Sequence, residues 1–188
     1  PAQLQALRAG LAEKLFDWFR NDRGRSCIAV DTETGGLDWH NHDLRLVQVG
    51  DTQAGFAIPW HLYGGLFKEI MAKWDGVVAL HNASFDLKFL EREKAWEPDW
   101  SRLADTMIMS KIIRPGRPAG LKPLSVELLD PRADFGQKLL KKAMDDNGWG
   151  WDTVPLHLPA YNMYAALDTV ETAHLYEHFR ADLAYPKV

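Results

Sequence analysis

Hydrophobic positions recur along the chain with two different periods, which predict an alternation of helices and strands. Leucines at every third or fourth position from Leu4 to Leu15, followed by Trp18, predict an amphipathic first helix that ends in turn residues at 21–24. Short apolar or alternating runs predict strands at 27–30, 44–50, 56–58 and 77–80. Helical spacing follows at 63–74, 85–94, 106–113, 121–129, 135–147 and 159–183. This order indicates an α/β layer structure with a mixed sheet.

Length and composition narrow the class of protein. The 188 residues are 46% hydrophobic and 26% charged, which is typical of a soluble globular domain rather than a disordered chain. No apolar run approaches the ~20 residues that a membrane span needs, so we expect no membrane association. The first four residues do not resemble a secretory signal. One cysteine, Cys27, excludes a disulfide framework and favours a reducing compartment, so we expect a cytoplasmic location, in a bacterium or a viral host.

The net charge is mildly acidic. Lys and Arg number 22, Asp and Glu number 26, and the net charge of −4 argues at face value against a nucleic-acid-binding protein. The position of individual acids changes that picture, because several of them follow predicted buried strands.

Asp31 and Glu33 come directly after the first predicted strand. Alternate residues of a strand point to the same face, so the two carboxylates are expected side by side, where they repel each other unless a cation or proton neutralises them. Ligands of α/β proteins gather near strand ends. On its own, an Asp-x-Glu pair is equally compatible with a solvated loop entrance.

Two further segments carry similar chemistry. Asp86 begins a helix after the strand at 77–80, and Tyr164 and Asp168 are four residues apart on one face of the last helix. Each segment also has an explanation without catalysis. Asp86 is an acid of the kind favoured in the first turn of a helix, and Tyr164 and Asp168 are compatible with a pair of residues on the protein surface. Together, the four carboxylates and the phenol form the oxygen-rich environment that Mg²⁺ and Mn²⁺ prefer. Two such ions ~4 Å apart activate water and stabilise the leaving oxygen of a phosphodiester.

The segments 31–37 (Asp-Thr-Glu-Thr-Gly-Gly-Leu) and 81–86 (His-Asn-Ala-Ser-Phe-Asp), with Tyr164-x-x-x-Asp168, resemble the three exonuclease motifs of the DEDD superfamily. The third motif is similar to that of the tyrosine branch. Met163 stands where the sister branch carries histidine. Asp105-Thr106-Met107 resembles the segment between the second and third motifs. The nearest resemblance is to the 3′–5′ proofreading domain of family A (polymerase I type) DNA polymerases, over residues 27–183.

The resemblance implies a ribonuclease H-like fold, with a five-stranded mixed sheet flanked by helices. Residues 1–188 are then a single 3′–5′ exonuclease domain, with an N-terminal helix at 1–22 and the exonuclease core at 27–183. The resemblance also implies site residues. The catalytic residues it implies are Asp31, Glu33, Asp86, Tyr164 and Asp168.

The resemblance assigns a role to each of these residues. Asp31, Glu33 and Asp168 are expected to hold the metal that activates water, and Asp31 is expected to share a second metal with Asp86. Tyr164 is expected to orient the water; its ordinary pKa of ~10 makes it a poor base. The implied cofactors are thus two divalent ions, Mg²⁺ or Mn²⁺.

The resemblance implies contacts with the substrate as well. Leu37 is expected to wedge against the terminal base, Asn82 and Phe85 to line the strand path, and the backbone at Thr32 to meet the 3′ end. His81 departs from the polar residues typical of its position.

The expected activity is release of nucleoside monophosphates from single-stranded or frayed DNA 3′ ends, with a polymerase domain as a partner in the same parent chain. Two alternatives stay open: a stand-alone ribonuclease D-like exonuclease acting on RNA, and a catalytically silent module of a polymerase. No residue pattern reads the 2′-OH, so the choice of nucleic acid rests on resemblance.

Four other signals have weaker support. His174-x-x-Glu177-His178 matches a zinc pattern, and His40-x-His42 lies among acids, but helix-end and loop positions explain both. The basic stretch 111–122 suits either phosphate contact or a solvated loop. Three tryptophans, Trp39, Trp60 and Trp149, are candidates for base stacking, although a core position is the default for each.

Overall fold

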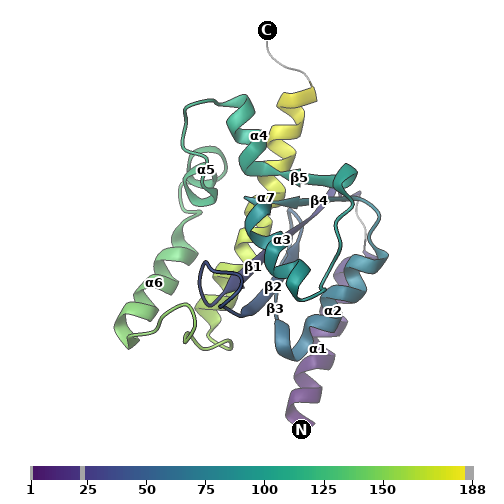
Figure 1. Cartoon of the computed structure of the whole chain (residues 1–188), viewed down its shortest axis with the longest axis vertical. Helices are drawn as coiled ribbons and strands as arrows, with labels where there is room; N and C mark the ends of the chain where they lie inside the picture. The colour runs from purple at the N-terminus through teal and green to yellow at the C-terminus, as the bar shows by residue number, and fades with distance from the viewer. Residues whose placement is uncertain (1, 22–23, 185–188) are drawn as a thin grey trace.

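The computed structural model describes residues 2–21 and 24–184, with side chains of the first helix described from residue 9 onward. The predicted packing of Leu4 and Leu7 and the turn residues Asp22 and Arg23 lie outside the described residues. Within them, the predicted α/β architecture is confirmed (Figure 1).

A mixed five-stranded sheet forms the centre of the fold, in the order β3-β2-β1-β4-β5. The central strand β1 pairs antiparallel with β2 and parallel with β4, and β5 continues the parallel side. The strands are β1 (Cys27–Thr34), β2 (Leu44–Gly50), β3 (Gly55–Pro59), β4 (Val77–Leu80) and β5 (Leu103–Asp105). The fifth strand was not among those that the hydrophobic pattern predicts, because its three half-buried residues are too few to show a period.

Helices cover both faces of the sheet. They are α1 (Ala2–Arg20), α2 (Trp60–Lys73), α3 (Ala83–Arg92), α4 (Thr106–Ile113), α5 (Leu121–Leu128), α6 (Phe135–Asn147) and α7 (Pro159–Ala184), with a short 3₁₀ turn at Trp100–Arg102. The long helix α7 lies across β1, β2, β3 and β4 on one face, with α4, α5 and α6 packed against it. On the other face, α2 and α3 pack against the strands and α1 packs on α2 (Figure 1). None of the helices, over the residues described, is long and apolar enough to span a membrane.

The alternation of side chains along β1 decides which way the acids point. Ile28 and Val30 belong to the large core that α2 completes, whereas Cys27 and Ala29 pack with Ala173 of α7. Because side chains two residues apart share a face, the acids at positions 31 and 33 continue the face that α7 covers.

Two glycines let α7 approach the sheet closely. A Cβ built on Gly55 would lie 2.1 Å from the carbonyl oxygen of Ala166, and one on Gly50 would lie 2.5 Å from Oγ1 of Thr169. Both distances are too short for any side chain. The depth at which α7 sits on the hairpin β2–β3 therefore depends on these two positions.

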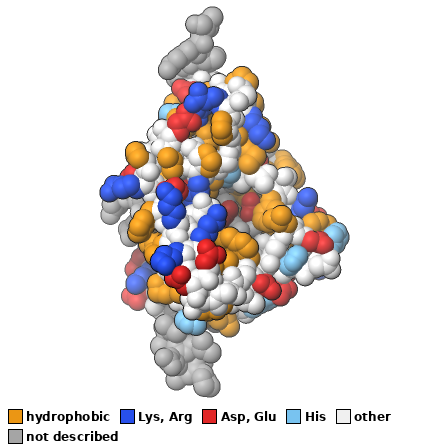
Figure 2. Space-filling model, turned by 90° about the vertical axis from the view of Figure 1, so that its left-hand side faces the viewer, with side chains coloured by type: hydrophobic (Ala, Val, Ile, Leu, Met, Phe, Trp, Pro, Cys, Tyr) orange, Lys and Arg blue, Asp and Glu red, His pale blue; other side chains and the backbone are white. Residues whose placement is uncertain are grey.

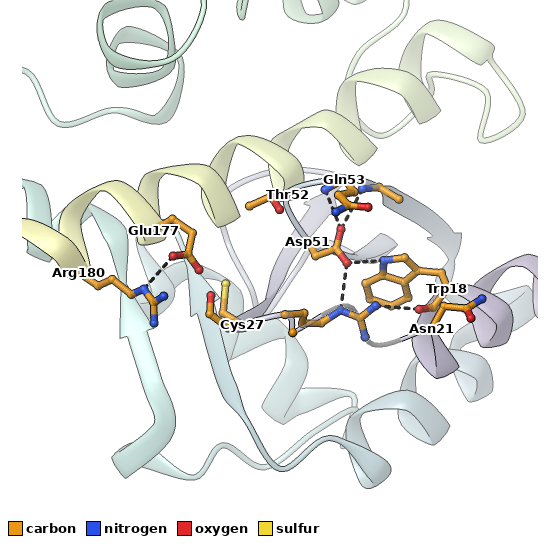
Figure 3. A pocket seen from close by; sticks show the side chains of 12 residues that line it. Trp18, Asn21, Cys27, Asp51, Thr52, Gln53, Glu177 and Arg180 are labelled. Atoms are coloured by element: carbon orange, nitrogen blue, oxygen red, sulfur yellow. Dashed lines mark hydrogen bonds and ion pairs between the residues drawn. The ribbon is translucent and has the colours of Figure 1, made fainter.

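Asp51 ties α1 to the turn between β2 and β3 (Figure 3). Its carboxylate accepts hydrogen bonds from Trp18 Nε1 at 2.7 Å and Arg25 Nε at 3.0 Å, and from the backbone N–H groups of Gln53 and Ala54. A polar pocket of about 500 Å³ lies between this network and the end of α7. It lies at the start of β1, whereas the acids lie at the end of that strand.

The glycine contacts generate a stability prediction. Gly55→Ala should lower the free energy of unfolding by about 3 kcal/mol, since overpacking a tight contact costs roughly 1–3 kcal/mol or more. Urea unfolding followed by circular dichroism measures the change. Gly65→Ala is the matched control: Gly65 is exposed in α2 with open space around it, so that variant should gain up to about 1 kcal/mol. Equal effects at both positions would contradict the close-approach argument.

Candidate functional site

Three carboxylates meet where the end of β1 faces α7. Each of Asp31, Glu33 and Asp168 offers one oxygen, and these oxygens lie within 4.8 Å of one another. Glu33 and Asp168 are buried, at 7% and 4% exposure, while Asp31 is half-buried. The strand and the helix that hold them are both packed in the core, so the cluster is preorganised.

Burial and mutual repulsion make the ionised state of this cluster costly. Burial, together with the charges of neighbouring carboxylates, raises the pKa of Asp31 and of Glu33 well above the ordinary values. Burial also raises the pKa of Asp168, to about 6, although the nearby Lys122 ammonium offsets part of that rise. A cation that approaches the cluster therefore gains from all three groups at once.

Asp86 reaches the cluster from the opposite face of β1. Thr32 lies between the two acids on the strand and points away from them, and its hydroxyl donates to Asp86 Oδ1 at 2.6 Å. Asp86 is 2% exposed, and burial raises its pKa to about 7. Its oxygens are not part of the group within 4.8 Å, which among the described residues comprises the three acids above.

The carboxylate of Asp105 accepts hydrogen bonds at the N-terminal ends of both α3 and α4. It therefore positions the segment that carries Asp86. Asp105 accepts the backbone N–H groups of Asn82 and Ala83 at 3.1 and 2.9 Å, and that of Met107 at 2.9 Å. Asn82 takes a left-handed backbone conformation, with φ of 67°, which asparagine tolerates better than most residues. The resemblance had marked Asp105, but not this bridging role.

His81 precedes this turn and is held in the fold by a side chain. Its Nδ1 lies 2.8 Å from Oγ1 of Thr106. Burial lowers the pKa of His81 to about 4, so the ring is neutral near pH 7.

Tyr164 lies one turn before Asp168 on the same face of α7, so the phenol and that carboxylate project together. Burial, with the charges of nearby acids, raises the pKa of the phenol well above its ordinary value. The ring of Trp151 packs 6.2 Å from the tyrosine ring. Tyr164 is therefore a fixed, protonated hydroxyl at the edge of the cluster.

Lys122 was not predicted as part of the site, although the basic stretch 111–122 contains it. Its Nζ contacts Oδ1 of Asp168 and both carboxylate oxygens of Glu171, the latter at 2.9 and 3.0 Å. The side chain is buried, whereas Arg114 and Arg117 of the same stretch pair with Glu127 nearer the surface. No sequence signal distinguished Lys122 from the other basic residues of that stretch.

Gln48 is a second polar residue that sequence reasoning missed. It lies directly opposite Asp31 in the β1–β2 register, so both side chains lie on the same face of the sheet. It is fully buried, and neither amide atom has a hydrogen-bond partner among the described residues. A buried amide without a partner is costly, which is consistent with a group whose natural partner is a ligand or a water at the cluster.

The donor set fits a hard divalent cation. All ligand atoms of the cluster are carboxylate oxygens, the type that Mg²⁺ and Mn²⁺ prefer. Burial and the neighbouring carboxylates raise the pKa values of Asp31 and Glu33. The same burial and like charges make the binding of a divalent cation favourable.

The residues expected to contact substrate lie in different environments. Leu37 is 86% exposed on the loop between β1 and β2, whose backbone carbonyls at Trp39 and His42 accept from Arg92. The Asn82 side chain is exposed, and Phe85 is half-buried against Phe89 at 5.3 Å between ring centroids. Thr32 is buried.

The weaker signals do not form sites among the described residues. His174 and His178 are both exposed, and Glu177 between them pairs with Arg180. Around His40 and His42, the oxygens of Asp38 are used by loop hydrogen bonds.

The candidate tryptophans have structural contacts. Trp60 is buried and donates from Nε1 to Glu93, and Trp39 and Trp149 pack against core clusters.

The chain is similar to known proteins over nearly its whole length. A family described as 3′–5′ exonuclease matches residues 11–184. The chain is 33% identical over 168 residues to the DNA polymerase of Mycobacterium phage L5 and 32% identical over 170 residues to that of Mycobacterium phage D29. Each match covers 80% of this chain but 28% of the polymerase, so the chain spans under a third of these relatives.

Solved structures with the same fold include two nucleases. Brucella melitensis NrnC with bound Mg²⁺ has a TM-score of 0.62 and 23% identity, covering 87% of this chain and 76% of that one. The Trypanosoma brucei RNase D complex with GMP has a TM-score of 0.65 and 19% identity, covering 93% and 57%. The ribonuclease H-like expectation for the fold is thereby confirmed. With the family match and the Tyr164-x-x-x-Asp168 motif, the chain belongs to the DEDD-type 3′–5′ exonucleases, in the tyrosine branch that includes the exonuclease domains of family A DNA polymerases.

Proposed function

We propose that this chain is a metal-dependent proofreading exonuclease domain that removes nucleoside monophosphates from single-stranded or frayed DNA 3′ ends. The convergence of Asp31, Glu33 and Asp168 at the end of the central strand is the observation that carries the proposal. Residues 1–188 act as one domain in it. The similarity to phage DNA polymerases supports DNA as the substrate and a polymerase domain in the same parent chain as the partner. It also supports action in the cytoplasm of a bacterium or phage host.

In this proposal Asp31, Glu33 and Asp168 would hold one divalent ion, Mg²⁺ or Mn²⁺, and Asp31 and Asp86 would hold a second. Ions held there supply positive charge that lowers the pKa of water and offsets negative charge on the scissile phosphate. Tyr164 orients the attacking water with its hydroxyl and does not act as a base, because the phenol stays protonated.

Substrate is held by residues at the rim of the cluster. The exposed Leu37 wedges against the terminal base, Asn82 and Phe85 line the path of the strand, and the backbone at Thr32 meets the 3′ end. Around the site, Lys and Arg side chains gather on the face formed by α5 and α6, beside a hollow in which acidic side chains are visible (Figure 2). The negative net charge is compatible with a polyanionic substrate, because the proposal assigns four of the acids to metal ions.

An RNA exonuclease is the second candidate, favoured by the fold shared with RNase D. Paired DNA and RNA oligonucleotides of one sequence, each labelled at the 5′ end, separate the two. Faster shortening of DNA from its 3′ end supports proofreading, and faster shortening of RNA supports the alternative. A module that binds DNA but never cleaves it in Mn²⁺ is the catalytically silent case.

Asp31→Asn should abolish exonuclease activity, with a loss of at least about 100-fold, typical of losing one preorganised charged group. The protein should stay folded, because the substitution relieves repulsion. A ladder assay on 5′-labelled DNA, with Mg²⁺ or with chelator, measures the loss. Asp145→Asn, an exposed acid on α6, should retain full activity as the control. Activity that survives chelation, or a ladder from a blocked 3′ end, is incompatible with the proposal.

Tyr164→Phe should lower kcat about 10- to 100-fold with little change in KM, since misplacing a reacting group by about 1 Å costs up to roughly 10²-fold. The melting temperature should change little, because the ring still packs beside Trp151. Single-turnover cleavage of a DNA oligonucleotide gives the rate. An unchanged rate would remove Tyr164 from the mechanism.

Stability of the metal-free protein should depend on pH through Asp86. Its folded pKa of about 7 exceeds the ordinary 3.8, so the folded state binds the extra proton and loses stability as pH rises between these values. Asp86→Asn cannot ionise, so its unfolding free energy relative to wild type should rise by a few kcal/mol from about pH 4 to about pH 7, at about 1.4 kcal/mol per pKa unit. Urea titrations in chelator at each pH provide the values, and a pH-independent difference contradicts the prediction.

A further inference from the structure

One lysine joins three side chains on a single stripe of α7. Tyr164, Asp168 and Glu171 are spaced by four and then three residues, which places them on one helical face. Lys122 Nζ contacts Asp168 Oδ1, lies 2.9 and 3.0 Å from the two oxygens of Glu171, and lies 5.2 Å from the centre of the Tyr164 ring. Its side chain is 10% exposed.

These contacts leave Lys122 no capacity to bind substrate. An ammonium group has three N–H donors, and the three carboxylate oxygens around it use all of them. Lys122 therefore does not bind a substrate phosphate from this position, although it belongs to a basic stretch for which phosphate binding is the first expectation.

Glu171 poses a problem for any metal site built on Asp168. It is a further buried carboxylate, at 7% exposure, only three residues away from Asp168 on the same helical face. Without Lys122, Asp168 and Glu171 would form a second pair of carboxylates able to attract a divalent ion. That ion would compete with Asp31 and Glu33 for Asp168.

We propose that Lys122 is a positioning residue that serves as a built-in cation of the exonuclease site. It fills the space between Asp168 and Glu171, fixes the Asp168 carboxylate through one oxygen, and confines the divalent ion to the side that faces Asp31 and Glu33. The proposal rests on the proposed exonuclease function. Glu171 acts in it as the anchor of the lysine, not as a metal ligand.

Lys122→Met and Lys122→Arg test the proposal, with Lys14→Met as control because Lys14 is exposed on α1. For each variant, steady-state kinetics at saturating Mg²⁺ give kcat and KM for a DNA oligonucleotide. Isothermal titration calorimetry with Mn²⁺ gives the number and affinity of bound ions without any substrate. Circular dichroism confirms that each variant is folded.

Lys122→Met should lose at least 10-fold in kcat, with KM within twofold of wild type, and should bind Mn²⁺ as tightly as wild type or take up one further ion. Lys122→Arg should recover most of kcat. A merely structural lysine predicts the opposite pattern, in which metal binding weakens together with activity.

Three results would overturn the proposal. They are a kcat within twofold of wild type in folded Lys122→Met, a loss confined to KM, and weakened Mn²⁺ binding together with an activity that excess Mg²⁺ restores. If Lys122→Met does not fold, Glu171→Gln tests the proposal instead. This variant removes the negative charge that holds Lys122 in place and keeps the lysine itself. It should lower kcat at least threefold without weakening Mn²⁺ binding, and wild-type behaviour in both counts against the proposal.

The two proposals fail in different ways. If wild-type protein cleaves no nucleic acid under any condition, the exonuclease function fails. The Mn²⁺ titrations still report whether Lys122 controls where ions bind.

Discussion

Carboxylates buried side by side repel each other, and the structure around this site is organised by that repulsion. Asp31, Glu33 and Asp168 offer oxygens within 4.8 Å of one another in a largely buried place. Their ionised forms become stable only when positive charge is supplied. The fold provides one such charge permanently, the ammonium of Lys122, whose contacts are all on the α7 side. The β1 side remains open to a divalent ion.

The sheet and α7 supply the rigidity that such a cluster needs. Alternation along β1 sends Ile28 and Val30 into the core while the acids two and four residues after Ala29 face α7. Gly55 lets that helix lie close enough for Asp168 to meet them. Asp86 is placed independently, through Thr32 and the helix starts that Asp105 holds. The four acids thus come from three backbone elements: Asp31 and Glu33 from β1, Asp86 from α3 and Asp168 from α7.

Most elements were predictable because their signals are local. The strands at 44–50 and 77–80 and the helices at 106–113 and 135–147 match the hydrophobic pattern residue for residue. The strand at 103–105 did not, because it exists through pairing with β4 and not through any period of its own. Similarly, the acidic residues were recognisable from their motifs, whereas Gln48 lacks a motif and is identified only by its register opposite Asp31.

The sequence by itself determined the alternation of strands and helices, the family and the identity of the acids, since periodicity and short motifs are written in consecutive residues. Only the tertiary structure decided that Asp86 pairs with Thr32, and that Lys122 turns inward to Asp168 and Glu171 while its basic neighbours pair with Glu127. Lys122 is 46 positions from Asp168 and 49 positions from Glu171 in the chain, so both ion pairs depend on how α5 packs against α7. No local pattern in the sequence encodes that packing.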